Sequence, residues 1–214
     1  MYEKLKITAY PRCGIVTDEY LPFDGILFYV AMRQKYGGQL LTTPGRMADV
    51  TAVDLPIEKR TINGEWLYAA SFAQWESSAD GQGFWVKRFD RKQSDFVDFG
   101  NRRGKVIVEQ GRYKAYRMPT FYRHALSVFW YVVGDKKEIE NLLIHVTHIG
   151  KKTAQGNGRI MRWQVEDWAH DWSIYGEDGR LMRAIPDKQG ILYGIRPSYW
   201  LRENQIVAAL PQSN

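Results

Sequence analysis

Between residues 135 and 165 the chain passes from a helical pattern to a strand pattern through a glycine-rich, basic segment. Asp135 and Glu138 have the spacing of a capping box, and five apolar residues then recur at helical intervals: Ile139, Leu142, Leu143, Val146 and Ile149. Residues 160–165 carry the pattern of a strand. The sequence therefore predicts a helix through residue 149 that enters the glycine-rich segment directly, and a strand that leaves it.

The glycine-rich segment, residues 150–162, suits a polyanionic ligand. Glycine allows positive backbone φ and close approach of a ligand to the main chain, and three are present: Gly150, Gly156 and Gly158. The same segment carries four cations and no acid. It is not a P-loop, which needs Lys followed by Ser or Thr after its last glycine, nor a dinucleotide fingerprint, which needs a third glycine near Met161. A basic surface turn is the alternative.

Positive charge is concentrated in the second half of the chain. Residues 100–125 hold seven Lys and Arg against Glu109 alone, and residues 150–162 add four more cations, within a total net charge of +6. Concentrated charge of one sign favours a nucleic-acid partner. Aromatic residues make up 14% of the chain and supply planar groups on which unpaired bases can stack.

Cysteine usage and hydropathy indicate the cellular compartment in which we expect the protein. Cys13 is the only cysteine, which excludes an internal disulfide and a multi-cysteine zinc site and fits a reducing cytosol. No signal-peptide pattern is present at the start, and no apolar run approaches the length of a membrane span. We expect a cytoplasmic protein with no membrane association and no cofactor.

The N-terminal residues predict one strand and one helix. Alternation of apolar and polar residues across residues 4–9 predicts a half-buried strand that closes at Pro11. Asp24 is in position to cap a helix, and Gly37-Gly38 is in position to end it.

The remaining elements are predicted to be strands. Turn signals at Asn63-Gly64, Gln110-Gly111 and Asp178-Gly179 predict hairpins, the second of which would pair residues 105–108 with residues 112–118. Residues 76–83 read as a polar loop, and residues 126–133 as a central strand. The order strand, helix, hairpins, strand, helix, strand predicts an α+β fold with a ferredoxin-like β-α-β-β-α-β core and inserted β-hairpins.

Four short stretches accompany the helix, loop and strand of residues 139–165: Lys-Ala-Tyr-Arg-Met-Pro at 114–119, Trp-Tyr at 130–131 with Gly-Asp at 134–135, Asp-Trp-Ser at 171–173, and Arg-Leu-Met-Arg at 180–183. Helix, loop and strand together resemble the CRISPR-associated RAMP superfamily of ferredoxin-like (RRM-like) RNA-binding proteins. The four stretches look like the small, Cas5-like subunit of type IV CRISPR effector complexes. The likeness is good over residues 111–186 and loose over residues 1–37; the loop departs from the family at Asn157, where an aromatic residue is common.

The resemblance implies a single RAMP domain over residues 1–214, with residues 38–104 as a thumb-like insertion and residues 168–214 as C-terminal β additions. It implies a non-catalytic subunit that binds the 5′ handle of the guide RNA (crRNA), caps the backbone filament and helps to contact PAM-proximal target DNA. The implied partners are crRNA, Cas7-like backbone subunits, large subunits and target DNA in a hetero-oligomeric complex.

Cationic, amide and glycine residues of the loop, together with basic and planar residues before residue 125, are expected to contact the RNA. Lys and Arg neutralise phosphates, glycine amides donate to them, and Asn and Gln read base edges. The expected RNA contacts are Lys151, Lys152, Thr153, Gln155, Gly156, Asn157, Gly158, Arg159, Lys114, Tyr116, Arg117 and Arg123. The expected DNA contacts are Lys87, Arg88, Arg102 and Arg103.

Two other functions remain open from the sequence. Some RAMP relatives cut precursor crRNA without metal by general acid-base chemistry, for which His124 would be the acting group and Lys151 its partner. A histidine that enters an apolar strand is otherwise a packed or hydrogen-bonded residue. The other alternative is an RNA-binding domain outside CRISPR. No metal site is expected, because His145 and His148 have no carboxylate in the same turn.

Overall fold

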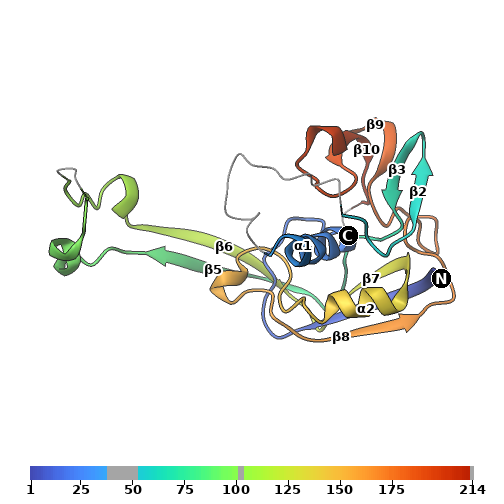
Figure 1. The fold of residues 1–214 in the computed structure, drawn as a ribbon, viewed down its shortest axis with the longest axis horizontal. Helices are drawn as coiled ribbons and strands as arrows, with labels where there is room; N and C mark the ends of the chain where they lie inside the picture. Colours follow the sequence, from blue (N-terminus) through green and yellow to red (C-terminus); the bar gives the residue numbers. More distant parts are fainter. Residues whose placement is uncertain (38–52, 101–103, 213–214) are drawn as a thin grey trace.

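The computed structural model describes residues 1–37, 53–100 and 104–212. Its centre is a four-stranded sheet in the order β4 (Gln74–Glu76), β7 (Ser127–Gly134), β1 (Glu3–Pro11) and β8 (Ile160–Asp167), and every neighbouring pair is antiparallel (Figure 1). The predicted α+β class and the predicted strands at residues 4–9, 126–133 and 160–165 are confirmed. None of the described helices is long and apolar enough to cross a membrane.

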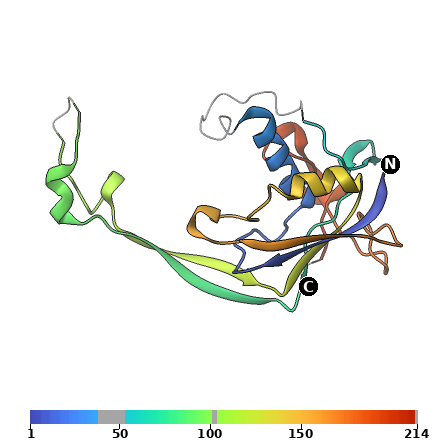
Figure 2. The ribbon, with the colours of Figure 1, turned by 60° about the horizontal axis from the view of Figure 1, so that its bottom comes forward.

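One face of the sheet forms the main core. In β1, Leu5, Ile7 and Ala9 are fully buried, and the register places them opposite Val132, Trp130 and Val128 of β7. Helices α1 (Phe23–Tyr36) and α2 (Lys136–Leu143) lie over this face (Figure 2) and contribute the apolar residues that pack on it. Full burial of each such side chain stabilises the fold by about 1.5–3 kcal/mol.

Helix α1 differs from the prediction at its N-terminus and agrees with it at its C-terminus. Its N-cap is Pro22, which makes no side-chain hydrogen bond, so the prediction that Asp24 caps the helix is wrong. Asp24 instead lies in the first turn, buried, and accepts a 2.6 Å hydrogen bond from the Tyr199 hydroxyl. Gly37 adopts a left-handed conformation and ends the helix as predicted, whereas Gly38 lies outside the described residues.

Helix α2 confirms the predicted cap and corrects the predicted length. The Asp135 carboxylate accepts a 3.2 Å hydrogen bond from the amide of Glu138. The helix ends at Leu143, not at residue 149, because the chain turns there and bonds to the next strand: the Ile160 amide donates to the Thr147 carbonyl at 2.9 Å. Val146 and Ile149 remain buried in the same core, which explains why the apolar periodicity continues past the helix.

A two-stranded arm projects from the sheet (Figures 1 and 2). It consists of β5 (Ala79–Lys87) and β6 (Tyr116–His124), paired antiparallel over their whole length, with the tip at residues 88–100 and 104–115. We call residues 79–100 and 104–124 the arm. Residues 79–83 are therefore strand, not the predicted polar loop, and the predicted hairpin of residues 105–108 with residues 112–118 is wrong, because β6 pairs with β5 instead.

The arm does not coincide with the insertion expected at residues 38–104. Residues 59–76 belong to β2 (Lys59–Ile62), β3 (Glu65–Tyr68) and β4 on the body of the protein, and residues 38–52 lie outside the described part of the chain. The predicted turn between β2 and β3 is confirmed: Asn63 and Gly64 have φ values of +50° and +87°.

The C-terminal part adds a second small sheet of β9 (Ile185–Gly194) and β10 (Gln205–Ala209). The hairpin predicted at Asp178-Gly179 is reduced to a single bridge between Tyr175 and Leu181.

Arg183 anchors the C-terminal segment to the body. Its side chain is fully buried and donates to the carbonyls of Tyr68 and Ala70 before β4, and to the Ile195 carbonyl at 2.7 Å. Its guanidinium also lies 3.5 Å from the Asp24 carboxylate. Burial raises the pKa of Asp24, and the nearby Arg183 charge acts in the opposite direction. Segments that are far apart in the sequence are thus held by one buried cation.

Candidate nucleic-acid interface

The glycine-rich loop lies between α2 and β8 and contains a short 3₁₀ turn, η5 (Thr153–Gln155). Gly158 is buried, has φ +69°, and donates a 2.9 Å hydrogen bond to the Gly14 carbonyl. A methyl group at this position would overlap the carbonyl oxygen of Ile149. Gly156 also has positive φ, +88°, but faces open space. Gly158 is therefore required for packing, and Gly156 only for backbone conformation.

The loop is joined to the arm through residues 12–18. The Lys151 amide donates to the Val16 carbonyl at 2.5 Å, and the Arg12 amide donates to the Arg159 carbonyl at 2.8 Å. On the other side, Ile15 and Arg123 at the base of β6 exchange two backbone hydrogen bonds of 2.9 Å each. Residues 12–18 thus hold the loop beside the base of the arm.

Side chains extend this connection along the arm. The Lys152 ammonium lies 5.6 Å from the centre of the Trp85 ring, and the Trp85 and Tyr116 rings lie 5.3 Å apart. The Lys87 ammonium lies 5.4 Å from the Tyr116 ring. Cross-strand pairing of Lys87 with Tyr116 and of Trp85 with Met118 puts these groups on one face of the arm. We call Lys152, Trp85, Tyr116 and Lys87 the cation–aromatic row.

The row has the chemistry of a single-strand binding surface. Cations neutralise phosphates and planar rings stack on bases, and the row places one cation at each end of a pair of rings.

The comparisons with known proteins identify the family of the chain. A model of the CRISPR type IV associated protein Csf3 family matches residues 3–211. The chain belongs to the Csf3 family. No curated protein matches it. The resemblance to a type IV CRISPR subunit that the sequence indicated is therefore confirmed at family level.

Several other predicted RNA contacts of this Csf3-family chain have intramolecular partners. The Lys151 ammonium lies 2.5 Å from the Asp18 carboxylate, so RNA would have to replace an ion pair there. The Asn157 amide donates to the Lys152 carbonyl at 3.4 Å and braces the loop. Gln155 and Arg159 are exposed, and Thr153 is half-buried.

The predicted residues on the arm divide between its two faces. Arg117 lies on the face opposite Tyr116, with its guanidinium 3.6 Å from the Phe84 ring centre. Arg123 pairs with Asp80 at 2.9 Å. Lys114 is exposed and precedes β6 instead of lying within a strand. The structure therefore brings Tyr116 to the loop and directs Arg117 and Arg123 elsewhere.

The predicted DNA contacts that the structure describes, Lys87 and Arg88, lie toward the tip of the arm. Lys87 belongs to the cation–aromatic row and also donates to the Arg112 carbonyl at 2.6 Å. Arg88 is exposed next to it. Arg102 and Arg103 lie outside the described residues.

Sequence reasoning missed Trp85. Trp85 is central to the row, yet its role depends on Tyr116, a residue about thirty positions later in the chain. At the base of the arm, the Tyr122 ring packs on Gly81 and Gly83 of β5 and on Gly14, where an added methyl group would lie 2.7 Å from the ring.

This packing predicts that Gly81→Ala loosens the base of the arm. The methyl group would overlap the Tyr122 ring, and such overpacking costs roughly 1–3 kcal/mol. We expect faster trypsin cleavage after Lys87 and Arg88 in limited proteolysis. Gly83→Ala is the matched control, because its methyl group would lie 3.3 Å from the same ring. Equal cleavage rates for the two variants would contradict this account of Tyr122.

The side chains of His124 and Lys151, the pair predicted for the endoribonuclease alternative, make other contacts in the described residues. Arg123, next to His124, pairs with Ile15, whereas Lys151 pairs with Val16, and no hydrogen bond joins the two side chains in the described parts of the chain. The His124 ring packs edge-on against Tyr122 at 5.0 Å. A search of the described residues finds no group of three or more His, Cys, Asp or Glu that could hold a metal ion.

Proposed function

We propose that this Csf3-family chain is a non-catalytic subunit of a type IV CRISPR effector ribonucleoprotein that binds the 5′ handle of crRNA and caps the Cas7-like backbone filament. The observation that carries the proposal is the contact between Lys152 of the glycine-rich loop and Trp85 of the arm. It joins two basic segments, far apart in the sequence, into one surface on which phosphates and bases can alternate.

The topology supports a ferredoxin-like RAMP core as the scaffold for this role. The strand order β4–β7–β1–β8 places α1 in the connection from β1 to β4 and α2 in the connection from β7 to β8. Both helices lie on one face of an antiparallel sheet, as the β-α-β-β-α-β plan requires. In this interpretation residues 150–162 are the glycine-rich loop after the second helix, and the arm is the thumb that grips the handle.

The position of basic residues on the arm also suggests which partner each surface would contact. Lys87 ends the cation–aromatic row and Arg88 follows it at the start of the tip. With Arg102 and Arg103 they would contact the phosphates of PAM-proximal target DNA. The large subunit and the backbone subunits would cover other surfaces of this cytoplasmic assembly.

Substitutions in the row test handle binding. Measured by fluorescence anisotropy with labelled crRNA, Trp85→Ala should weaken binding by roughly 5- to 150-fold, because base stacking on an aromatic ring contributes about 1–3 kcal/mol. Lys152→Ala should make the slope of log affinity against log salt shallower by about 0.7, the value for one phosphate contact on a single strand. Lys188→Ala, an exposed cation on β9, is the matched control and should leave both unchanged.

An RNA of the same length with a scrambled handle should bind more weakly than crRNA. Equal affinity for both RNAs, or equal weakening by Lys188→Ala and Lys152→Ala, would refute the proposal.

The same samples also show whether the protein cleaves RNA. We expect precursor crRNA to remain intact, whereas products with 2′,3′-cyclic phosphate ends that disappear in His124→Ala would replace the non-catalytic role with the endoribonuclease alternative.

A further inference from the structure

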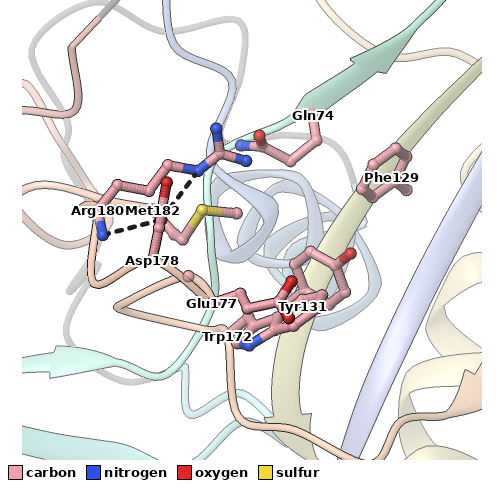
Figure 3. A pocket seen from close by; sticks show the side chains of 9 residues that line it. Gln74, Phe129, Tyr131, Trp172, Glu177, Asp178, Arg180 and Met182 are labelled. Carbon is pink, nitrogen blue, oxygen red and sulfur yellow. Dashed lines mark hydrogen bonds and ion pairs between the residues drawn. The ribbon is translucent and has the colours of Figure 1, made fainter.

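The face of the central sheet opposite the helices borders a cavity. Lys6 of β1 and Phe129 and Tyr131 of β7 point to this face, because they alternate with the core residues of the same strands. The segment of residues 168–182 covers part of it. A cavity of about 330 Å³ remains, lined by Gln74, Phe129, Tyr131, Trp172, Gly176, Glu177, Asp178, Arg180 and Met182 (Figure 3).

Aromatic rings form one wall of this cavity. Tyr131 lies 4.9 Å from Trp172 in an edge-on arrangement, and Phe129 lies 5.7 Å from Tyr131. Trp168 packs behind them, 5.5 Å from both Tyr131 and Trp172. The rings hold one another in place, so the wall is rigid and apolar before any ligand binds.

The turn of residues 176–180 forms the opposite, polar rim. The Asp178 carboxylate accepts from the Arg180 amide at 3.1 Å and lies 3.7 Å from the Arg180 guanidinium. Asp178 is thereby occupied in fixing the turn. The Glu177 carboxylate is exposed, and it has no hydrogen-bond or ion-pair partner among the residues that the structure describes.

We propose that this cavity binds a guanine base of single-stranded RNA. The base would stack on the aromatic wall, Glu177 would accept hydrogen bonds from the guanine N1–H and N2–H groups, and Arg180 would lie near a phosphate. Guanine is the only RNA base whose pairing edge presents two adjacent N–H donors to a carboxylate. Adenine, cytosine and uracil each present an acceptor beside a donor at that edge.

Charges of both signs surround the site. Arg180 lies on the rim, and the Lys6 ammonium lies 4.6 Å from the ring centre of Phe129 at the edge of the wall. These two cations would attract a phosphate, while the Glu177 carboxylate, which lines the cavity beside Asp178, would attract N–H donors.

The site is separate from the proposed handle surface. None of the residues that line the cavity belongs to the glycine-rich loop or to the arm. A result that refutes one of the two proposals therefore does not refute the other.

The test is titration of the whole protein, carrying ¹⁵N-labelled tryptophan, with 5′-GMP, AMP, CMP and UMP. Each of the eight indole N–H groups gives its own NMR signal, and Trp172→Phe identifies that of Trp172. We expect GMP to shift the Trp172 signal and to bind about tenfold more tightly than the other nucleotides, in line with a bidentate contact. Glu177→Gln should remove this preference, whereas Glu140→Gln on the exposed side of α2 should keep it.

Lys152→Ala should bind GMP like wild type, even where it weakens crRNA binding. Equal affinities for the four nucleotides, or the absence of any Trp172 shift, would overturn the proposal. A larger Trp172 shift with an arginine-containing tripeptide than with GMP would overturn it in favour of a protein side chain.

Discussion

Arg183→Ala is expected to lower the free energy of unfolding by about 3–5 kcal/mol, the cost of breaking a buried ion pair from one side. The substitution leaves the buried Asp24 carboxylate without its cation, and it leaves the carbonyls of Tyr68, Ala70 and Ile195 without a donor. Urea denaturation followed by tryptophan fluorescence measures the loss.

Arg180→Ala is the matched control, because Arg180 lies three residues earlier in the same segment with an exposed side chain. An exposed ion pair contributes at most about 1 kcal/mol, so this variant should unfold close to wild type. Adding Asp24→Asn to Arg183→Ala should restore part of the stability, since it removes the unpaired charge. A loss below about 1 kcal/mol for Arg183→Ala would show that the cation is dispensable.

The free energy of unfolding that Arg183→Ala removes should depend on pH, and the direction of this dependence can be predicted. Burial already raises the pKa of Asp24 above its usual 3.8, and removal of Arg183 removes a charge that opposes this rise. A carboxyl group whose pKa is higher in the folded state stabilises the fold fully below its unfolded pKa, and this stabilisation is lost as pH rises through the folded pKa. The variant should therefore be less destabilised near pH 4 than near pH 8.

Gly158→Ala is the second substitution with a large expected effect. We expect a loss of more than about 2 kcal/mol, because a left-handed conformation alone costs a non-glycine residue roughly 1–2 kcal/mol and the methyl group also meets the Ile149 carbonyl. The loop would move away from Gly14, so crRNA affinity should fall together with stability.

Gly156→Ala provides the comparison within the same loop. Its φ is also positive, but nothing lies near the added methyl group, so only the conformational cost remains. The denaturation midpoints should therefore rank wild type, Gly156→Ala, Gly158→Ala in decreasing order. Identical midpoints for the two variants would mean that Gly158 is needed for φ alone.

The parts of the fold that could be predicted depend on local patterns. The alternation of apolar and polar residues identified β1, and Asp135 caps α2 through the amide of Glu138, three residues later. Both patterns therefore lie within a short stretch of sequence. Asp24 looked like a helix cap from its neighbours alone. Its actual partner, Arg183, is 159 residues away in the sequence, and no local pattern indicates it.

The arm shows the same limit. Glycines at 81 and 83 made residues 76–83 resemble a loop, yet in β5 they accommodate the Tyr122 ring from the opposite strand. For the site, basic composition alone singled out Lys152 as part of a concentrated cationic loop. It could not identify Trp85, because the value of that ring depends on which segments the fold brings beside it.

The register of β1 has a consequence for biosynthesis. Glu3 pairs with Gly134 and Leu5 with Asp167, so β1 has no partner in the central sheet until β7 and β8 have been translated. Until then the apolar faces of β1 and α1 are uncovered, which slows folding and exposes the nascent chain to aggregation. A subunit of this design is expected to need chaperone protection during synthesis, before any RNA or neighbouring subunit is available to it.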